Sequence, residues 1–282
     1  MGIILGLAAA LLYGGSDFGG GLLSRRLGSL RVNVIGSVAA TALAWVALVA
    51  FGAPEPSLRA VAWGLASGLG GGAGTLVLYR GLARGQMSVV GPVSAVASAA
   101  VPVTVGVALG ERPTMLATAG VLVALPAIVL VAASGSVRGK LGAGMTDGLI
   151  AGVAFGIMFI GLAQAGGAAG GGGLWPVASE QTGSMLLILA VALKSRESRE
   201  SLRVPLRQVA QPALVGAAGM AATLLYFYAT HFSMLATAAV LVSLYPGVTV
   251  LLARMLLHER FSPVQRAGLS LCTVAVVAIA LN

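Results

Sequence analysis

Charged side chains are scarce in this sequence. Only 9% of its 282 residues are Asp, Glu, Lys or Arg, whereas roughly a quarter are charged in ordinary soluble domains. This is too little charge to cover the surface of a water-soluble fold. The net charge of +9 is spread over short connections, so we expect no nucleic-acid partner.

Groups that carry chemistry are also few. The one cysteine, Cys272, and the two histidines, His231 and His258, lie in separate segments, which excludes a disulfide framework and gives neither a zinc site nor a Cys/His dyad. The glycine run 166–173 is not followed by Gly-Lys-Ser/Thr, so it is no phosphate-binding loop. We therefore expect no enzyme activity, no cofactor and no metal.

Apolar residues, in contrast, make up 58% of the chain. They form continuous runs such as Met115–Ala133 instead of the alternating pattern of a membrane β-barrel. Only α-helices satisfy the backbone of such runs in lipid, and each span takes about 20 residues. The apolar windows predict ten spans, over residues 3–23, 33–52, 60–82, 88–109, 114–134, 146–165, 174–193, 208–230, 235–257 and 263–281.

An internal repeat relates the two halves of the chain. Residues 6–14 (GLAAALLYG) align with residues 148–156 (GLIAGVAFG), and residues 109–112 (LGER) align with residues 257–260 (LHER), at offsets of 142 and 148. We therefore predict two five-helix repeats, at residues 1–137 and 138–282. Because five is odd, the second repeat enters the membrane from the opposite side. Inverted repeats of this kind form alternating-access carriers, which hold substrate near the midplane in a central cavity.

These motifs carry a resemblance to a known family. Residues 13–18 (YGGSDF) are similar to a W-G-S-N-F pattern in the first helix, and residues 101–112 and 243–260 are similar to helix ends of the form P-x-x-T…L-G-E-R. The chain thus resembles the drug/metabolite transporter superfamily, specifically its EamA family. The resemblance implies ten helices, a central cavity lined chiefly by helices one, three, four, six, eight and nine, and carriage of small metabolites, often outward.

Asp17 is the most suggestive single residue. It lies about fourteen residues into the first span, where an acid costs at least a few kcal/mol and is a functional candidate by default. We predict that Asp17 faces the cavity and either pairs with a cationic substrate or carries a coupling proton. The alternatives are a structural pair with Arg25 or Arg26, or a helix break at Gly14-Gly15.

The other predicted substrate-binding residues are aromatic or polar side chains in or near apolar spans. Tyrosines near helix ends are either interfacial anchors or the lining of one cavity mouth, and a serine or tyrosine beside a kinking proline faces either packed helices or the cavity. The residues are Tyr13, Tyr79, Ser94, Tyr226, Tyr245 and His231. By contrast, we interpret Glu180 with Gln181 as an interfacial polar pair. We interpret Glu111-Arg112 and Glu259-Arg260 as structural ties, with a gate function as the alternative.

The positions of the cations predict an orientation. Of the 17 Lys and Arg residues, only Arg59 and Arg112 lie in even-numbered connections. Cations favour the cytoplasmic side, so the odd-numbered connections are predicted to face inwards and both termini outwards. The family resemblance implies the reverse, with both termini in the cytoplasm.

The function that we expect is that of a secondary active transporter in the inner (plasma) membrane, moving a small metabolite or organic cation outwards by alternating access, with proton exchange. Its partners would be the substrate, protons and the lipid bilayer, and the chain could act as a monomer or a homodimer. One alternative is a lipid-intermediate flippase with a basic rim at Arg80 and Arg84. Another is a non-transporting membrane assembly subunit.

Overall fold

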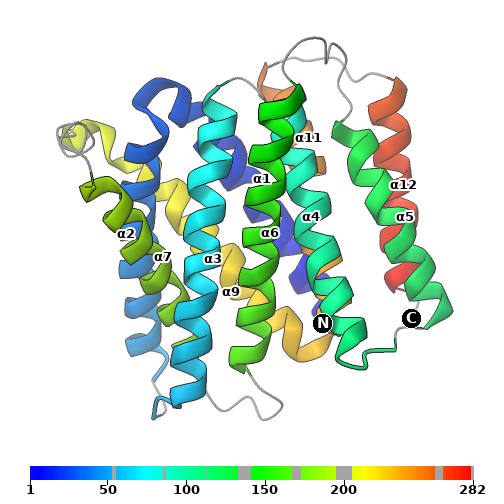
Figure 1. Cartoon of the computed structure of the whole chain (residues 1–282), viewed down its shortest axis with the longest axis horizontal. Helices are drawn as coiled ribbons and strands as arrows, with labels where there is room; N and C mark the ends of the chain where they lie inside the picture. Colours follow the sequence, from blue (N-terminus) through cyan, green and yellow to red (C-terminus); the bar gives the residue numbers. More distant parts are fainter. Residues whose placement is uncertain are drawn as a thin grey trace.

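The computed structural model is a bundle of α-helices (Figure 1). Its described part contains no β-strand. The residues that it describes are 1–52, 55–84, 87–112, 114–132, 141–166, 173–194, 205–257 and 263–280. The predicted boundary between residues 137 and 138 and the motif residues His258, Glu259 and Arg260 lie outside this part.

The helices follow the predicted spans closely. The first half contains α1 (Gly2–Leu27), α2 (Ser29–Ala50), α3 (Leu58–Ala83), α4 (Met87–Ala108) and α5 (Met115–Ala132). The second half contains α6 (Leu141–Gly166), α7 (Trp175–Leu193), the 3₁₀ turn η1 (Leu206–Gln208), α9 (Ala210–Phe232), α10 (Leu235–Val242), α11 (Tyr245–Leu257) and α12 (Pro263–Ala280). By length and composition, α1, α2, α3, α6, α7 and α9 can each cross a membrane.

The ninth predicted span is broken into α10 and α11 at Ser243-Leu244. Pro246 has no backbone N–H, so it cannot donate to the carbonyl four residues earlier. The chain turns instead, and Gly247 N donates to Leu244 O at 2.9 Å. Proline alone does not explain the break, because α4 and α5 continue through Pro102 and Pro126.

The two halves pack against each other through helix pairs that are equivalent in the two repeats. In the first half, α1 and α2 pack on α9, while in the second half α6 and α7 pack on α3. Likewise α1 packs on α10 and α11, and α6 packs on α4. The pair α5 and α12 lies together at one edge of the bundle, opposite α2 and α7 (Figure 1). Each half thus completes the other, as expected for a two-repeat fold.

Glycines permit the closest of these contacts. A Cβ on Gly216 in α9 would overlap Gly36 O in α2, and a Cβ on Gly68 in α3 would overlap Glu180 O in α7 and lie 2.9 Å from Gly183 Cα. Gly216 follows Gly68 by 148 positions, the offset that relates the two LxER motifs. These two crossings are therefore equivalent sites of the two repeats, where small residues let helix backbones meet.

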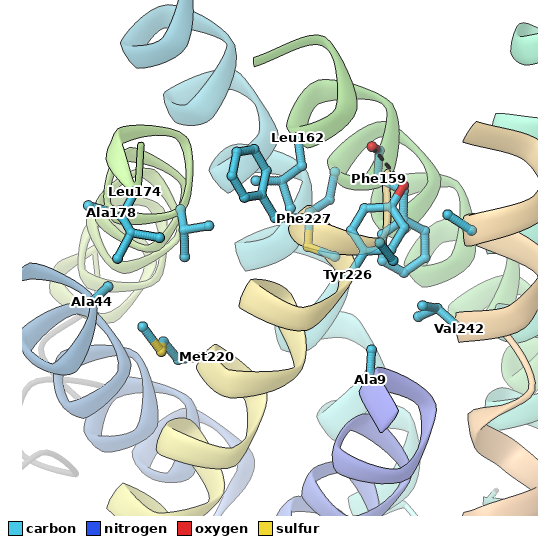
Figure 2. Close-up of a cluster of buried hydrophobic side chains, with 14 of the residues drawn as sticks. Ala9, Ala44, Phe159, Leu162, Leu174, Ala178, Met220, Tyr226, Phe227 and Val242 are labelled. Carbon is cyan, nitrogen blue, oxygen red and sulfur yellow. Dashed lines mark hydrogen bonds between the residues drawn. The ribbon is translucent and has the colours of Figure 1, made fainter. Parts of the chain in front are cut away.

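Larger apolar side chains gather on one side of the cavity described below. Figure 2 shows this cluster, in which Phe159, Leu162, Tyr226 and Phe227 come from α6 and α9. The rings of Phe159 and Tyr226 have centroids 4.5 Å apart, and the Tyr226 hydroxyl donates to Phe159 O at 3.0 Å. This contact holds Phe159 in place, and Phe159 in turn lines the cavity.

Candidate functional site

A cavity lies at the meeting of the two halves. The space between its protein atoms, together with open solvent at its mouth, amounts to about 820 Å³. Its walls come from α1, α2, α3, α4, α6, α7, α9 and α11, so α2 and α7 join the helices that the family resemblance implies. Its polar and aromatic lining side chains, with one methionine, include Tyr13, Asp17, Tyr79, Ser98, Phe155, Met158, Phe159, Glu180, Gln181, Thr223 and Tyr245.

The cavity is asymmetric along the helices. It reaches Val32 and Asn33 in the first turns of α2 and Tyr79 in the last turns of α3, so it extends to the side where α1 joins α2. In the other direction its lining ends near Tyr13, Phe159 and Thr223, in the middle of their helices. The cavity therefore extends towards one face of the bundle, the face of the odd-numbered connections.

Asp17 lines this cavity, on α1, as the sequence predicts. Its charge is near enough to interact with the hydroxyl groups of Tyr13, Tyr79 and Tyr245, from α1, α3 and the start of α11. The structure shows no ion pair between Asp17 and Arg25 or Arg26, both of which are exposed. Helix α1 also runs unbroken through Gly14-Gly15. Both structural alternatives for this acid therefore lack support.

Glu180 is the second acid of the cavity, and the interfacial interpretation of it is wrong. Its side chain is only 2% exposed, and its Oε2 atom has no hydrogen-bond partner among the described residues. The carboxylate reaches the glycine face of α3, where a Cβ on Gly71 would lie 2.7 Å from Oε1. The sequence did not reveal this, because Glu180 lies only five residues after the first residue of α7.

Tyr13 connects the surroundings of the two acids. The Tyr13 hydroxyl hydrogen-bonds the Thr223 hydroxyl at 2.8 Å. Gln181 Nε2 also donates to the Thr223 hydroxyl, at 3.5 Å. Tyr13 lies within electrostatic range of both Asp17 and Glu180. This network ties α1, α7 and α9 together at the inner end of the cavity.

Tyr79 and Tyr245, two further predicted residues, also line the cavity. Tyr79 is held by a bond from its hydroxyl to Ser16 O at 3.5 Å. Tyr245 follows directly after the break between α10 and α11, where Ser243 hydrogen-bonds Ser98 at 3.2 Å. The helix break therefore places an aromatic hydroxyl near Asp17.

Ser94, Tyr226 and His231 lie outside the lining of the cavity. Ser94 is fully buried behind it, close enough to interact with Tyr245. Tyr226 is buried against Phe159, and His231 lies at the exposed end of α9, where its Nδ1 is 2.9 Å from Phe227 O. A role of these three in substrate binding stays a prediction.

Glu111 joins the two halves at the face away from the cavity opening. Its Oε1 accepts from Leu235 N at 2.7 Å, and its Oε2 accepts from Ala236 N at 3.1 Å. A carboxylate in this place satisfies the first N–H groups of α10 and complements the helix dipole. The predicted tie at Glu111 thus exists, as a cap on a helix of the other half.

Arg80 and Arg84, at the end of α3, both reach Asp147 in α6. The distances are 2.6 Å from Arg80 Nη2 to Oδ1 and 3.4 Å from Arg84 Nη1 to Oδ2. Asp147 is 5% exposed, and nothing in the sequence pattern singled it out. The two arginines are therefore tied to a neighbouring helix instead of forming an independent basic rim.

The charges of the cavity are of one sign. Its described lining contains two carboxylates, Asp17 and Glu180, and no Lys, Arg or His side chain. Five aromatic rings share the lining: Tyr13, Tyr79, Phe155, Phe159 and Tyr245. Carboxylates attract cations, and aromatic faces add cation–π attraction. Chemically, this arrangement suits a small organic cation.

The comparison with known families decides the identity of the chain. The sequence matches the EamA-like transporter family over residues 1–133 and 142–281. The chain belongs to this family. An EamA-like transporter is a multi-pass integral membrane protein of the drug/metabolite transporter type that acts on small molecules.

A solved structure supports the fold of this EamA-like transporter. It is titled only "Crystal structure of protein" and superposes with a TM-score of 0.70 at 17% identity, covering 99% of this chain and 96% of that chain. At this identity the likeness shows the fold alone. No curated protein matches the sequence significantly.

Proposed function

We propose that this EamA-like transporter is a secondary active exporter of a small organic cation or metabolite, working by alternating access and proton exchange in the inner (plasma) membrane. In this proposal the chain spans the membrane ten times, as two inverted five-helix repeats that meet at the cavity. The observation that carries the proposal is the cavity lining, which holds Asp17 and Glu180 and, among the residues that the structure describes, no basic side chain.

Asp17 is the proposed partner of the substrate cation. A pair of unit charges about 4 Å apart gains about 4 kcal/mol at the effective dielectric constant of about 20 typical of protein sites. A cation over an aromatic face adds about 0.5–2 kcal/mol, and Tyr13, Tyr79 and Tyr245 surround the acid. A neutral molecule of the same shape gains neither term, so the site favours amines and quaternary ammonium ions.

Two other functions have less support. The flippase alternative depended on a basic rim at Arg80 and Arg84, and both side chains pair with Asp147. A non-transporting assembly subunit has no need of a cavity that holds two acids. Neither alternative is favoured by a separate observation.

The test is transport by purified protein in liposomes. Amines, quaternary ammonium ions, amino acids and neutral molecules of matched shape are offered with and without a pH gradient. We expect uptake of at least one cation, stimulated by an opposing proton gradient, and loss of this transport in Asp17→Asn. The matched control is Glu55→Gln, which removes an exposed carboxylate between α2 and α3. Unchanged transport by Asp17→Asn would refute the role of Asp17, and preference for neutral molecules would refute the proposal.

A further inference from the structure

Glu180 is not needed to bind a single positive charge at Asp17. It nevertheless lines the same cavity, almost completely buried, with Oε2 unpartnered among the described residues. Burying an ionised carboxylate without a partner is costly in free energy. The carboxyl avoids this cost when it is protonated, and a cation that arrives with the ligand would supply the partner that its ionised form lacks.

The two acids form separate subsites. No hydrogen bond or electrostatic contact joins the carboxylate of Asp17 to that of Glu180. Tyr13 lies within electrostatic range of both. The neighbouring wall is apolar, formed by Met158 and Phe159 of α6. The cavity thus offers two carboxyl groups on different helices, α1 and α7, together with an apolar and aromatic wall.

The glycine face of α3 lies directly against the Glu180 carboxylate. Gly71 has no side chain, and a Cβ there would reach to 2.7 Å from Glu180 Oε1 and 3.0 Å from Met158 Sδ. An ammonium group donates up to three hydrogen bonds, which matches an unpaired carboxylate oxygen. A ligand with one cation at Asp17 leaves Glu180 Oε2 without a partner, whereas a ligand with two cations can pair with both acids.

We propose that the cavity of this transporter recognises a linear diamine, with one ammonium at Asp17, the other at Glu180 and the methylene chain against Met158 and Phe159. This inference rests on the proposed function, because it takes the cavity to be the substrate site. It deepens that function by naming the substrate class.

The experiment measures binding to the purified protein by isothermal titration calorimetry. Linear diamines of increasing length are compared with the monoamine of each length. We expect at least one diamine to bind at least about tenfold more tightly than its monoamine, the gain typical of one additional charged hydrogen bond. In Glu180→Gln this ratio should fall to about one, because the second ammonium loses its charge partner.

The possible outcomes distinguish a failure of the diamine inference from a failure of the proposed function. Equal affinities for diamines and monoamines in the wild-type protein overturn the inference but leave the proposed function intact. A ratio that persists in Glu180→Gln places the second amine elsewhere and also overturns it. If no amine binds at all, the proposed function itself fails. Glu55→Gln, which removes an exposed carboxylate, is the control and should keep the wild-type ratio.

Discussion

At the scale of single residues, the glycine face of α3 determines how much space the carboxylate of Glu180 has. Gly71 faces only the ends of flexible side chains, at Glu180 Oε1 and Met158 Sδ. Gly15, by contrast, faces open space within 4 Å. The two glycines therefore provide a matched pair of positions at which the same small substitution has different consequences.

The first prediction concerns Gly71→Ala. The new methyl group displaces the Glu180 carboxylate while the helix is kept, so the stability of the solubilised protein should change by less than about 1 kcal/mol, since overpacking is offset by the better helix propensity of Ala. The affinity for the preferred cation should fall by roughly tenfold, which corresponds to about 1.4 kcal/mol. Thermal unfolding in detergent and calorimetric titration measure the two effects.

The control for this substitution is Gly15→Ala, which should keep the wild-type affinity and raise stability by about 1 kcal/mol, because Ala has the better helix propensity and the new methyl group meets no other atom. If Gly71→Ala binds cations as the wild-type protein does, the space beside Glu180 has no part in recognition.

The two acids also show what a sequence reveals about single residues. Asp17 could be predicted because it lies deep in an apolar run, where an acid is costly. Glu180 could not, because its distance from the start of α7 suggested contact with water. Its burial depends on the packing of α3 against α7 at Gly68 and Gly183, a contact between residues far apart in the chain.

At the scale of helices, the bundle depends on the two glycine crossings, α2 with α9 and α3 with α7. Apolar runs of sufficient length predicted where each helix lies, because lipid requires the backbone to be paired within the segment. The break between α10 and α11 was not predictable in the same way, since Pro102 and Pro126 lie in continuous helices while Pro246 follows a break. At the break between α10 and α11, the Ser243 hydroxyl hydrogen-bonds the Ser98 hydroxyl of α4.

The second prediction concerns Gly68→Ala in α3. Unlike Gly71, Gly68 faces backbone atoms, including Ser184 N at 2.7 Å and Gly183 Cα at 2.9 Å. A backbone cannot rotate away, so α3 and α7 must separate. We expect a loss of about 1–3 kcal/mol, the usual cost of overpacking, seen as a lower unfolding temperature in detergent. A stability equal to that of Gly15→Ala would contradict the crossing as described.

At the scale of the whole molecule, the opening of the cavity coincides with the distribution of charge. The cavity extends to the face where α1 joins α2 and α3 joins α4. The odd-numbered connections on this face carry all cations except Arg59 and Arg112. If cations mark the cytoplasmic side, the cavity extends towards the cytoplasm, the side from which the proposed exporter would load its substrate.

The third prediction follows from this distribution. A phosphatase reporter fused after Asn282 should be active, because the ten proposed spans would place the C-terminus outside the cytoplasm, on the face opposite the odd-numbered connections. A fluorescent protein that folds only in the cytoplasm should give no signal at this position. In chains truncated and fused after Arg84, the fluorescent protein should be active and the phosphatase inactive. A cytoplasmic signal from the Asn282 fusion would mean that the cavity opens outwards in this structure. Loading from the cytoplasm would then require the opposite conformation, in which the Glu111 cap on α10 must open.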